Sequence, residues 1–400
     1  MDIFSIPTPF FLFDERAMYQ ELTKLKKAID FFWPNTIIAY SVKTNSLPYL
    51  AKFFSCNEVY AEVVSEDEYD LVKECGYGSR NIVCNGPIKS YSFVSKLMEE
   101  GTIINMDSHR EVEYAVRYAQ NNPSKQYKVG IRVNVDVESS FPSESKAGFH
   151  GSRFGFCMLN DELKKAINFL RDGNIIINGL HLHVSTSTRR VEIYEWLTRL
   201  FVHIVEDNQL HDIEYFDIGG GFYGGLPDKP QWGDYLKSIS KILHENGFKN
   251  ESLSLIIEPG VSLLAGAFSY YSSVIDVKDT NRTRFVVTDG SRIHIDPFFH
   301  KTSYYYDIIS KNKSGNKTTE QVVVGFTCLE YDDIMTLNDS DELKKGDIIR
   351  YDKLGAYTLS LSPLFISFFP AVYTINQHGG VRVVRERWSS KEFIQKSIIS

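Results

Sequence analysis

The sequence lacks the features that mark several classes of protein. Its five cysteines are odd in number and form no CxxC pair, which argues against a disulfide framework and against a zinc site. Basic residues are not in excess either, because 44 lysines and arginines face 51 acidic residues and leave a formal net charge of −7. That balance disfavours nucleic acid and anionic membranes as partners. We therefore expect no bound metal, no nucleic-acid partner and a reducing, cytoplasmic setting.

Segments typical of membrane insertion are also scarce. No basic stretch precedes the short apolar run at 9–13, so the start of the chain does not resemble a secretory signal. The uncharged stretch 357–375 is long enough to cross a membrane. It contains Pro363, Pro370 and several serines, and it reads as strands and turns instead. We expect no membrane partner.

What the chain does contain is a repeated alternation of short apolar runs with amphipathic stretches. Between most of the runs, apolar residues recur every three or four positions, as in 190–208, where Ile193, Leu197 and Phe201 share one helical face. Alternating strands and helices imply parallel pairing, and eight such units imply a closed (β/α)8 barrel of the TIM type. The eight predicted strands are 36–41, 58–64, 81–85, 102–107, 128–135, 179–184, 215–218 and 254–258.

The alternation stops near residue 265. Apolar runs at 268–277, 284–288, 321–326, 347–351 and 381–385 follow one another without long helices between them, which predicts a mostly antiparallel β-domain. The run at 10–13 is a candidate strand of the same domain. We expect the barrel to span 28–265, and the β-domain to combine 1–27 with 266–400.

A lysine follows the first apolar run of the barrel. Lys43 comes directly after Ala39-Tyr40-Ser41-Val42, where a cation must reach solvent or be held for chemistry. A surface lysine is the simpler explanation. At the mouth of a barrel, however, a lysine partly removed from water has a lowered pKa and can condense with the aldehyde of pyridoxal 5'-phosphate (PLP).

Three further strand ends carry residues that suit such a cofactor. His183 ends the sixth run, and a neutral imidazole there can stack on a pyridine ring, although a satisfied core histidine is the alternative. Gly219, Gly220 and Gly221 end the seventh run and let backbone N–H groups approach a phosphate, or simply make a tight turn. Glu258 ends the eighth run, where a carboxylate needs a partner such as a pyridinium N–H.

In this order, the motifs resemble those of fold-type III PLP-dependent decarboxylases, the alanine racemase-like group that includes diaminopimelate and ornithine decarboxylases. The resemblance extends over about residues 8–370. The motifs that carry it are Tyr40-Ser41-Val42-Lys43-Thr44-Asn45, Ser65 with Glu68, Ser152-Arg153-Phe154-Gly155, His183-Val184-Ser185-Thr186, Gly219-Gly220-Gly221, Glu258-Pro259-Gly260, Cys328 after Gly-Phe-Thr, and Gly355-Ala356-Tyr357-Thr358.

The resemblance implies a role for each matching residue. Lys43 would hold PLP as a Schiff base, Glu258 would bind the pyridine nitrogen, and His183 would stack on the ring. Thr186, Tyr357 and the glycines Gly219, Gly220 and Gly221 would contact the phosphate. Cys328 would return a proton to the α-carbon after carbon dioxide leaves. A homodimer whose sites are shared between subunits is the assembly that the resemblance implies.

Departures from the family pattern bear on the substrate. Val261 stands where these enzymes usually carry an arginine after Glu-Pro-Gly, and Leu329 stands where an acid usually follows the cysteine. Glu330 and Asp332 are candidates to replace that acid, and Asp296 lies where diaminopimelate decarboxylases carry Arg-Pro. We therefore expect an α-decarboxylase of a diamino or modified amino acid rather than of diaminopimelate itself.

Two other functions stay open at this point. A fold-type III amino acid racemase would share the barrel and the β-domain, but that group ordinarily places an arginine against the pyridine nitrogen, where this chain has Glu258. A non-catalytic PLP-binding homologue is disfavoured because both Lys43 and Cys328 are present.

Overall fold

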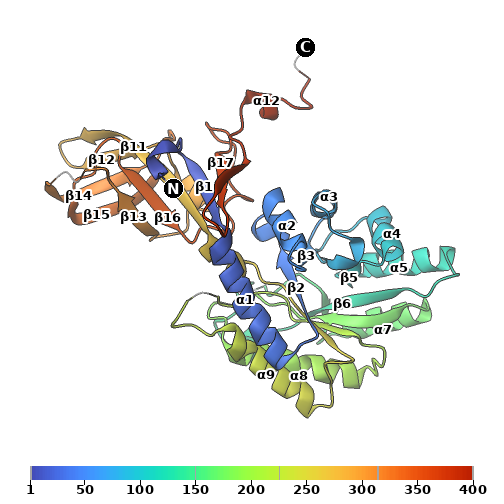
Figure 1. Cartoon of the computed structure of the whole chain (residues 1–400). Coiled ribbons are helices and arrows are strands. Elements are labelled where there is room, and N and C mark those ends of the chain that lie inside the picture. Colours follow the sequence, from blue (N-terminus) through green and yellow to red (C-terminus); the bar gives the residue numbers. More distant parts are fainter. Residues whose placement is uncertain (1, 149, 225, 313–314, 399–400) are drawn as a thin grey trace. The chain divides into compact units, whose positions relative to one another are not determined.

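The computed structural model describes residues 2–148, 150–224, 226–312 and 315–398 (Figure 1). The chain forms two compact units, one of Glu21–Leu263 and the other of Met1–Gln20 with Leu264–Ser400. The sequence analysis placed the first boundary after residue 27. The observed boundary lies nearer the N-terminus, within helix α1 (Glu15–Phe32), because this continuous helix contributes residues to both units.

The unit Glu21–Leu263 is a closed barrel of eight parallel strands. Around the barrel the strands follow the order β2, β3, β4, β5, β6, β8, β9 and β10, and β10 pairs with β2 again. This confirms the (β/α)8 prediction. The strands are β2 (Thr36–Ser41), β3 (Tyr60–Val63), β4 (Ile82–Cys84), β5 (Ile103–Met106), β6 (Lys128–Asn134), β8 (Ile176–His181), β9 (Tyr215–Asp217) and β10 (Ser254–Ile257), with the two-residue β7 (Phe156–Cys157) added beside β6.

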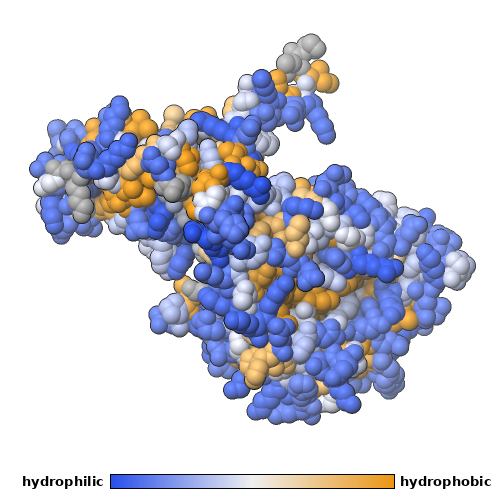
Figure 2. Space-filling view, viewed as in Figure 1, coloured by the Kyte–Doolittle hydropathy of each residue, from blue (hydrophilic) through white to orange (hydrophobic). Residues whose placement is uncertain are grey.

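Helices alternate with these strands. They are α2 (Pro48–Ser55), α3 (Glu66–Glu74), α4 (Tyr91–Glu100), α5 (His109–Asn121), α6 (Val137–Ser140), α7 (Glu162–Asp172), α8 (Val191–Asp207), α9 (Trp232–Glu245) and α10 (Val261–Leu264). In α8 the apolar stripe of Ile193, Leu197 and Phe201 is buried, as its spacing indicated. The opposite faces of the helices give the barrel a largely hydrophilic outer surface (Figure 2).

An aromatic ring lies inside the barrel and is accommodated by two glycines. Tyr215 on β9 is 5% exposed. A Cβ atom placed on Gly179 of β8 would lie 1.9 Å from Tyr215 Cζ, and one on Gly130 of β6 would lie 2.0 Å from Tyr215 Oη. Since real Cβ atoms do not approach other atoms this closely, both positions require glycine. The hydroxyl of Tyr215 donates a hydrogen bond of 2.8 Å to Asn105 Oδ1, a residue of β5.

The second unit is built on a mixed nine-stranded sheet. Among its described residues, six of the eight strand pairings are antiparallel, while β1 with β17 and β12 with β14 are parallel. The N-terminal run pairs with β11 and β17, as expected. The strands are β1 (Phe10–Asp14), β11 (Phe268–Asp279), β12 (Arg284–Thr288), β13 (Tyr305–Ile309), β14 (Lys317–Val324), β15 (Asp333–Asp341), β16 (Ile348–Asp352), β17 (Ala371–Ile375) and β18 (Val381–Arg385).

Short helices complete this unit: η1 (Ile3–Ser5), η4 (Ala265–Ala267), α11 (Arg292–Ile295) and α12 (Ser390–Phe393). The uncharged stretch 357–375 forms turns and β17, in agreement with the sequence analysis. Across the described ranges of both units, no helix has the length and apolarity to traverse a bilayer.

We expect Gly179→Ala to lower the free energy of unfolding by about 1–3 kcal/mol or more, because the added methyl group overlaps the Tyr215 ring. Gly78→Ala is the matched control, since nothing lies within 4 Å of a Cβ at that position. Chemical denaturation of both variants followed by circular dichroism measures the difference. Equal stability of the two variants would contradict the close packing of Tyr215 on Gly179.

Candidate active site

Lys43 lies just beyond β2, at the carboxyl end of the barrel strands. The strand ends at Ser41, as the predicted run 36–41 indicated, and the chain then turns into the 3₁₀ helix η2 (Val42–Thr44) that carries Lys43. Lys43 Nζ lies 2.6 Å from Oε2 of Glu62, a buried residue of β3. The hydroxyl of Ser41 donates to the same oxygen at 2.6 Å. This lysine is therefore held by a buried carboxylate.

The segment that carries Glu258 packs against this turn. Ser41 N donates to Pro259 O at 3.2 Å, and a Cβ on Gly260 would lie 2.4 Å from Thr44 Oγ1. Glu258 directly follows β10 and is 5% exposed. The ends of β2 and β10 thus bring Lys43 and Glu258 into one site, as the sequence analysis expected from their positions.

A second acid accompanies Glu258. Asp217, the last residue of β9, is fully buried and accepts a hydrogen bond of 2.9 Å from Gly219 N. Burial raises the pKa of Asp217 to about 7. Burial also raises the pKa of Glu258 well above its usual range, and the carboxylates of Asp217 and Glu62 raise it further. Asp217 and Glu258 therefore share a proton at neutral pH.

Glu62 behaves in the opposite way. Although burial acts to raise its pKa, the charge and hydrogen bond of Lys43, with the hydrogen bonds of Ser41 and Asn85, bring the pKa below its usual value. The site therefore contains one carboxylate that is ionised beside the lysine, and one pair of carboxyl groups that retains a proton.

Two histidines line the same end of the barrel. Strand β8 ends at His181, so His183 lies two residues beyond the strand end at which we expected it. His183 Nδ1 accepts a hydrogen bond of 3.2 Å from Gly220 N, and burial, with the nearby charge of Arg132, lowers the His183 pKa to about 3. The imidazole is therefore neutral, as a ring that stacks on a pyridine should be.

His181 was not predicted from the sequence. It is 2% exposed, and neither of its ring nitrogens has a hydrogen-bond partner among the described residues. Burial lowers its pKa well below the usual value, so this imidazole is also neutral. Its Nε2 lies 3.8 Å from Glu258 Oε2. A buried imidazole without a hydrogen bond is costly, which indicates a site built to receive another group.

The glycine run lies between His183 and Glu258. Gly219 and Gly221 have φ values of +69° and +89°, a conformation that favours glycine. A Cβ on Gly219 would lie 2.5 Å from His183 Nδ1, and one on Gly220 would lie 2.4 Å from Glu258 O.

Thr186, which was also predicted to contact the phosphate, is a buried residue that follows β8. Its backbone pairs with that of Ser145 in an isolated antiparallel β-bridge.

Sequence reasoning missed the polar residues within the barrel strands. Glu62, Asn85, Asn105 and Asp217 are all at most 3% exposed and hydrogen-bonded to one another or to Glu258. The sequence did contain a sign of them, because each is a polar residue inside or directly after an apolar run. Three of these runs are the successive strands β3, β4 and β5, and the fourth is β9.

The remaining predicted residues belong to the second unit. Cys328 and Glu330 are exposed, and Tyr357 is 37% exposed with a φ of 56°. Asp332 is buried, and its carboxylate accepts hydrogen bonds from Ser291, Arg292 N and Thr327.

Asp296 is buried as well. It accepts hydrogen bonds from the Arg292 guanidinium and from the backbone of His300 and Lys301. Asp296 and Asp332 therefore both order loops of their own unit, which does not favour the predicted contact with substrate.

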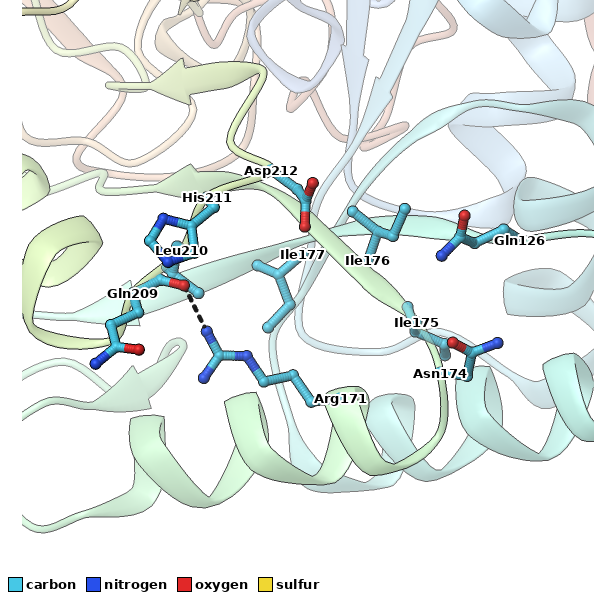
Figure 3. Close-up of a pocket in the computed structure, with 10 residues that line it drawn as sticks. All are labelled: Gln126, Arg171, Asn174, Ile175, Ile176, Ile177, Gln209, Leu210, His211 and Asp212. Carbon is cyan, nitrogen blue, oxygen red and sulfur yellow. Dashed lines mark hydrogen bonds between the residues drawn. The ribbon is translucent and has the colours of Figure 1, made fainter.

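A separate pocket of about 130 Å³ lies at the opposite ends of the strands (Figure 3). It is lined by the residues that lead into β8, such as Asn174 and Ile175, and by 209–212. Arg171 turns its guanidinium toward the backbone, where it donates to Gln209 O at 2.9 Å. The pocket contains none of the residues described above.

The match to known proteins agrees with this geometry. Residues 16–265 match the family model described as "Pyridoxal-dependent decarboxylase, pyridoxal binding domain". Because the match covers more than half of the chain, the protein belongs to the pyridoxal-dependent decarboxylases, and its cofactor is pyridoxal phosphate. It is an amino acid decarboxylase of the fold-type III group.

Individual relatives are similar over nearly the whole chain. The diaminopimelate decarboxylase of Aquifex aeolicus is 24% identical over 98% of this chain and 92% of the relative. The L-glutamyl-[BtrI acyl-carrier protein] decarboxylase of Niallia circulans is 27% identical over 97% of this chain and 93% of the relative. The crystal structure of diaminopimelate decarboxylase from M. jannaschii has a TM-score of 0.86 at 24% identity and covers 99% of this chain and 93% of that structure, so it shares the fold.

The residues at the barrel mouth fit pyridoxal phosphate. Lys43 offers an amine, the Asp217 and Glu258 pair offers a shared proton, and the glycine run offers backbone with no side chain in the way. The unpartnered imidazole of His181 indicates that the polar lining is incomplete without a ligand. His181, Asp217 and Glu258 have donor atoms within 4.8 Å of one another, a spacing that could also hold a metal ion, so the expected absence of a metal stays a prediction.

The raised pKa of Asp217 predicts how stability depends on pH. In the cofactor-free protein the folded state binds the proton more tightly than the unfolded state, so this group stabilises the fold most below about pH 4. Its contribution is lost as the pH rises toward about 7, at up to about 1.4 kcal/mol per pH unit.

Asp217→Asn should therefore gain stability relative to wild type as the pH rises from about 4 to about 7. Urea unfolding across this range measures the difference, with the exposed residue Asp228 as the control in Asp228→Asn. Parallel pH profiles for wild type and Asp217→Asn would contradict the shared proton.

Proposed function

We propose that the site built around Lys43 removes the α-carboxylate of an amino acid whose side chain differs from that of diaminopimelate. The observation that carries the assignment of the site is the pairing of Lys43 with the buried Glu62, beside carboxyl groups at Asp217 and Glu258 that share a proton. At one barrel mouth, the lysine matches the aldehyde of pyridoxal phosphate and the protonated acid matches its pyridine nitrogen.

Lys43 would hold the cofactor covalently through Nζ, and Glu258 would face its pyridine nitrogen. The backbone of Gly219, Gly220 and Gly221, with Thr186 and Tyr357, would hold the phosphate, and His183 would lie against the ring. When bound, pyridoxal phosphate supplies an electron sink for the electrons of the bond to the departing carboxylate.

The side chains of the barrel hold protons at defined atoms. Glu62 keeps a negative charge 2.6 Å from Lys43 Nζ and so would orient this amine for its bond to the cofactor. Glu258 and Asp217 keep one proton between them at the pyridine end, where it supports the electron sink. His183 is neutral and adds no charge that would compete with that proton.

Residues of the second unit would complete the reaction. Cys328 is exposed and would return a proton to the α-carbon after carbon dioxide leaves. We propose that the chain acts as a homodimer, with Cys328 and Tyr357 of one subunit serving the barrel of the other, as the family resemblance implies.

The substrate is proposed to be a diamino or modified amino acid. Among the three acids predicted to bind it, Glu330 has the exposed carboxylate, and we assign the substrate contact to it. We assign no substrate contact to Asp296 or Asp332. The carboxylate of Asp296 accepts from Arg292, and that of Asp332 accepts from Ser291 and Thr327. One similar protein acts on glutamate carried by an acyl-carrier protein, which supports including conjugated amino acids as substrates.

Carbon dioxide release from the PLP-loaded protein tests the activity. We expect one responsive substrate in a panel of basic, acidic, N-modified and carrier-linked amino acids of both configurations. Lys43→Ala should lose the absorbance of covalently bound cofactor and reduce release to the uncatalysed rate. Lys52→Ala, on helix α2, is the control and should behave as wild type. Wild-type absorbance in Lys43→Ala would refute the assignment of Lys43.

Mixing inactive variants tests the shared site. Lys43→Ala and Cys328→Ala place their defects on different units, so random exchange should give half heterodimers with one intact site of two. Activity should recover to about a quarter of wild type. The control is Lys43→Ala mixed with Glu258→Ala, whose defects lie on the same barrel and should not complement. Proven exchange without recovery would show that each site is built within one chain.

A further inference from the structure

A chain of buried amide groups connects the two ends of the site. The hydroxyl of Tyr215 donates to Asn105 Oδ1, which leaves Asn105 Nδ2 to donate to Asn85 Oδ1 at 2.9 Å and to Asp217 Oδ2 at 3.2 Å. Asn85 Nδ2 in turn donates to Glu62 Oε1 at 3.2 Å and to Glu258 Oε1 at 2.5 Å. All six side chains are at most 5% exposed.

The direction of every hydrogen bond in this chain is determined. If the Asn85 amide were reversed, its oxygen would face two carboxylates and its nitrogen would face the nitrogen of Asn105. The same holds for Asn105, whose oxygen must face the Tyr215 hydroxyl so that its nitrogen can reach Asp217. Each amide is thus oriented by the one before it, starting from a tyrosine ring enclosed by Gly130 and Gly179.

The orientation of Asn85 has a consequence for Glu258. Because Glu258 Oε1 accepts from Asn85, a proton on this carboxyl group is favoured on Oε2, the oxygen that lies 3.8 Å from His181 Nε2. The same amide group fixes Glu62 Oε1, so that Glu62 Oε2 is left to accept from Lys43 and Ser41. One asparagine therefore decides which oxygen each of the two carboxyl groups presents.

We propose that Asn85 is a positioning residue that orients Glu62 toward Lys43 and Glu258 toward the pyridine end with the same amide group. This inference rests on the proposed function, since it assigns the two carboxyl groups to the two ends of the cofactor. Asn85 itself does not touch the reacting atoms. Ser41 offers a contrast within the same site, because among the described residues its hydroxyl donates to Glu62 and forms no side-chain hydrogen bond with Glu258.

Double-mutant cycles on cofactor affinity test the proposal. Asn85→Ala should weaken PLP binding about tenfold or more, and a measurable part of this loss should disappear when Glu258 is already replaced in Glu258→Ala. The same should hold against Glu62→Ala. Ser41→Ala is the matched control, which should interact with Glu62→Ala and be additive with Glu258→Ala. Equilibrium dialysis measures the dissociation constants without relying on turnover.

A second readout separates positioning from general packing. The ionisable groups that face Glu258 include Asp217, Glu62, His181, Lys43 and Tyr215. Because the Asn85 hydrogen bond favours the ionised carboxylate, Asn85→Ala should move the pH midpoint of the bound-cofactor absorbance upward by about one unit. Ser41→Ala should leave this midpoint unchanged. If Asn85→Ala does not fold, Asn85→Asp keeps the shape and loses the donors, and it carries the same test.

The outcomes distinguish this inference from the proposed function. Additivity of Asn85→Ala with Glu258→Ala, together with an unchanged pH midpoint, would overturn the role of Asn85 while wild type still binds PLP. A wild-type protein that binds no PLP would instead overturn the proposed site itself.

Discussion

The structure of the barrel depends on burying three carboxyl groups beside one lysine. Glu62, Asp217 and Glu258 are each at most 5% exposed, and Lys43 is the cation within hydrogen-bond distance of this group. Three buried negative charges against one positive charge would be unfavourable in a medium of low dielectric constant. The site resolves this by pairing Glu62 with Lys43 and by retaining a proton between Asp217 and Glu258. The same solution produces the protonated acid that a pyridine nitrogen requires.

The packing of the barrel serves this electrostatic arrangement. Gly130 and Gly179 make room for Tyr215, and the Tyr215 hydroxyl begins the hydrogen bonds that reach Asn85. A larger residue at either glycine would displace the ring and, with it, the amide that holds Glu62 and Glu258. Core packing and site chemistry are thus linked through one aromatic side chain, and both are expected to respond to the same substitutions.

Membership of the pyridoxal-dependent decarboxylases accounts for the cofactor and the type of reaction, and the proposed substrate depends on residues of the second unit. Asp296 and Asp332 are occupied by contacts within their own unit, so they are poor candidates for a distal amine or carboxylate. Substrate selection is therefore expected to depend on Glu330 or on apolar contacts, which suits a side chain that is modified or masked.

The order of apolar runs was sufficient to predict the eight parallel strands, the change to a β-domain near residue 265, and the residues at the strand ends, because these follow from local periodicity. It predicted the bounds of β2 but not those of β8, which was expected over 179–184 and spans Ile176–His181. Nor could it predict the roles of Asn85, Asn105 and His181, or the occupied carboxylates of Asp296 and Asp332. Their environments are set by strands distant in sequence, and hydrogen bonding and desolvation depend on which neighbours the closed barrel or folded loop brings together. The sequence by itself determined which chemical groups are present and in what order. The tertiary structure decided which of them share a proton, which are ionised, and which are used only to hold the others in place.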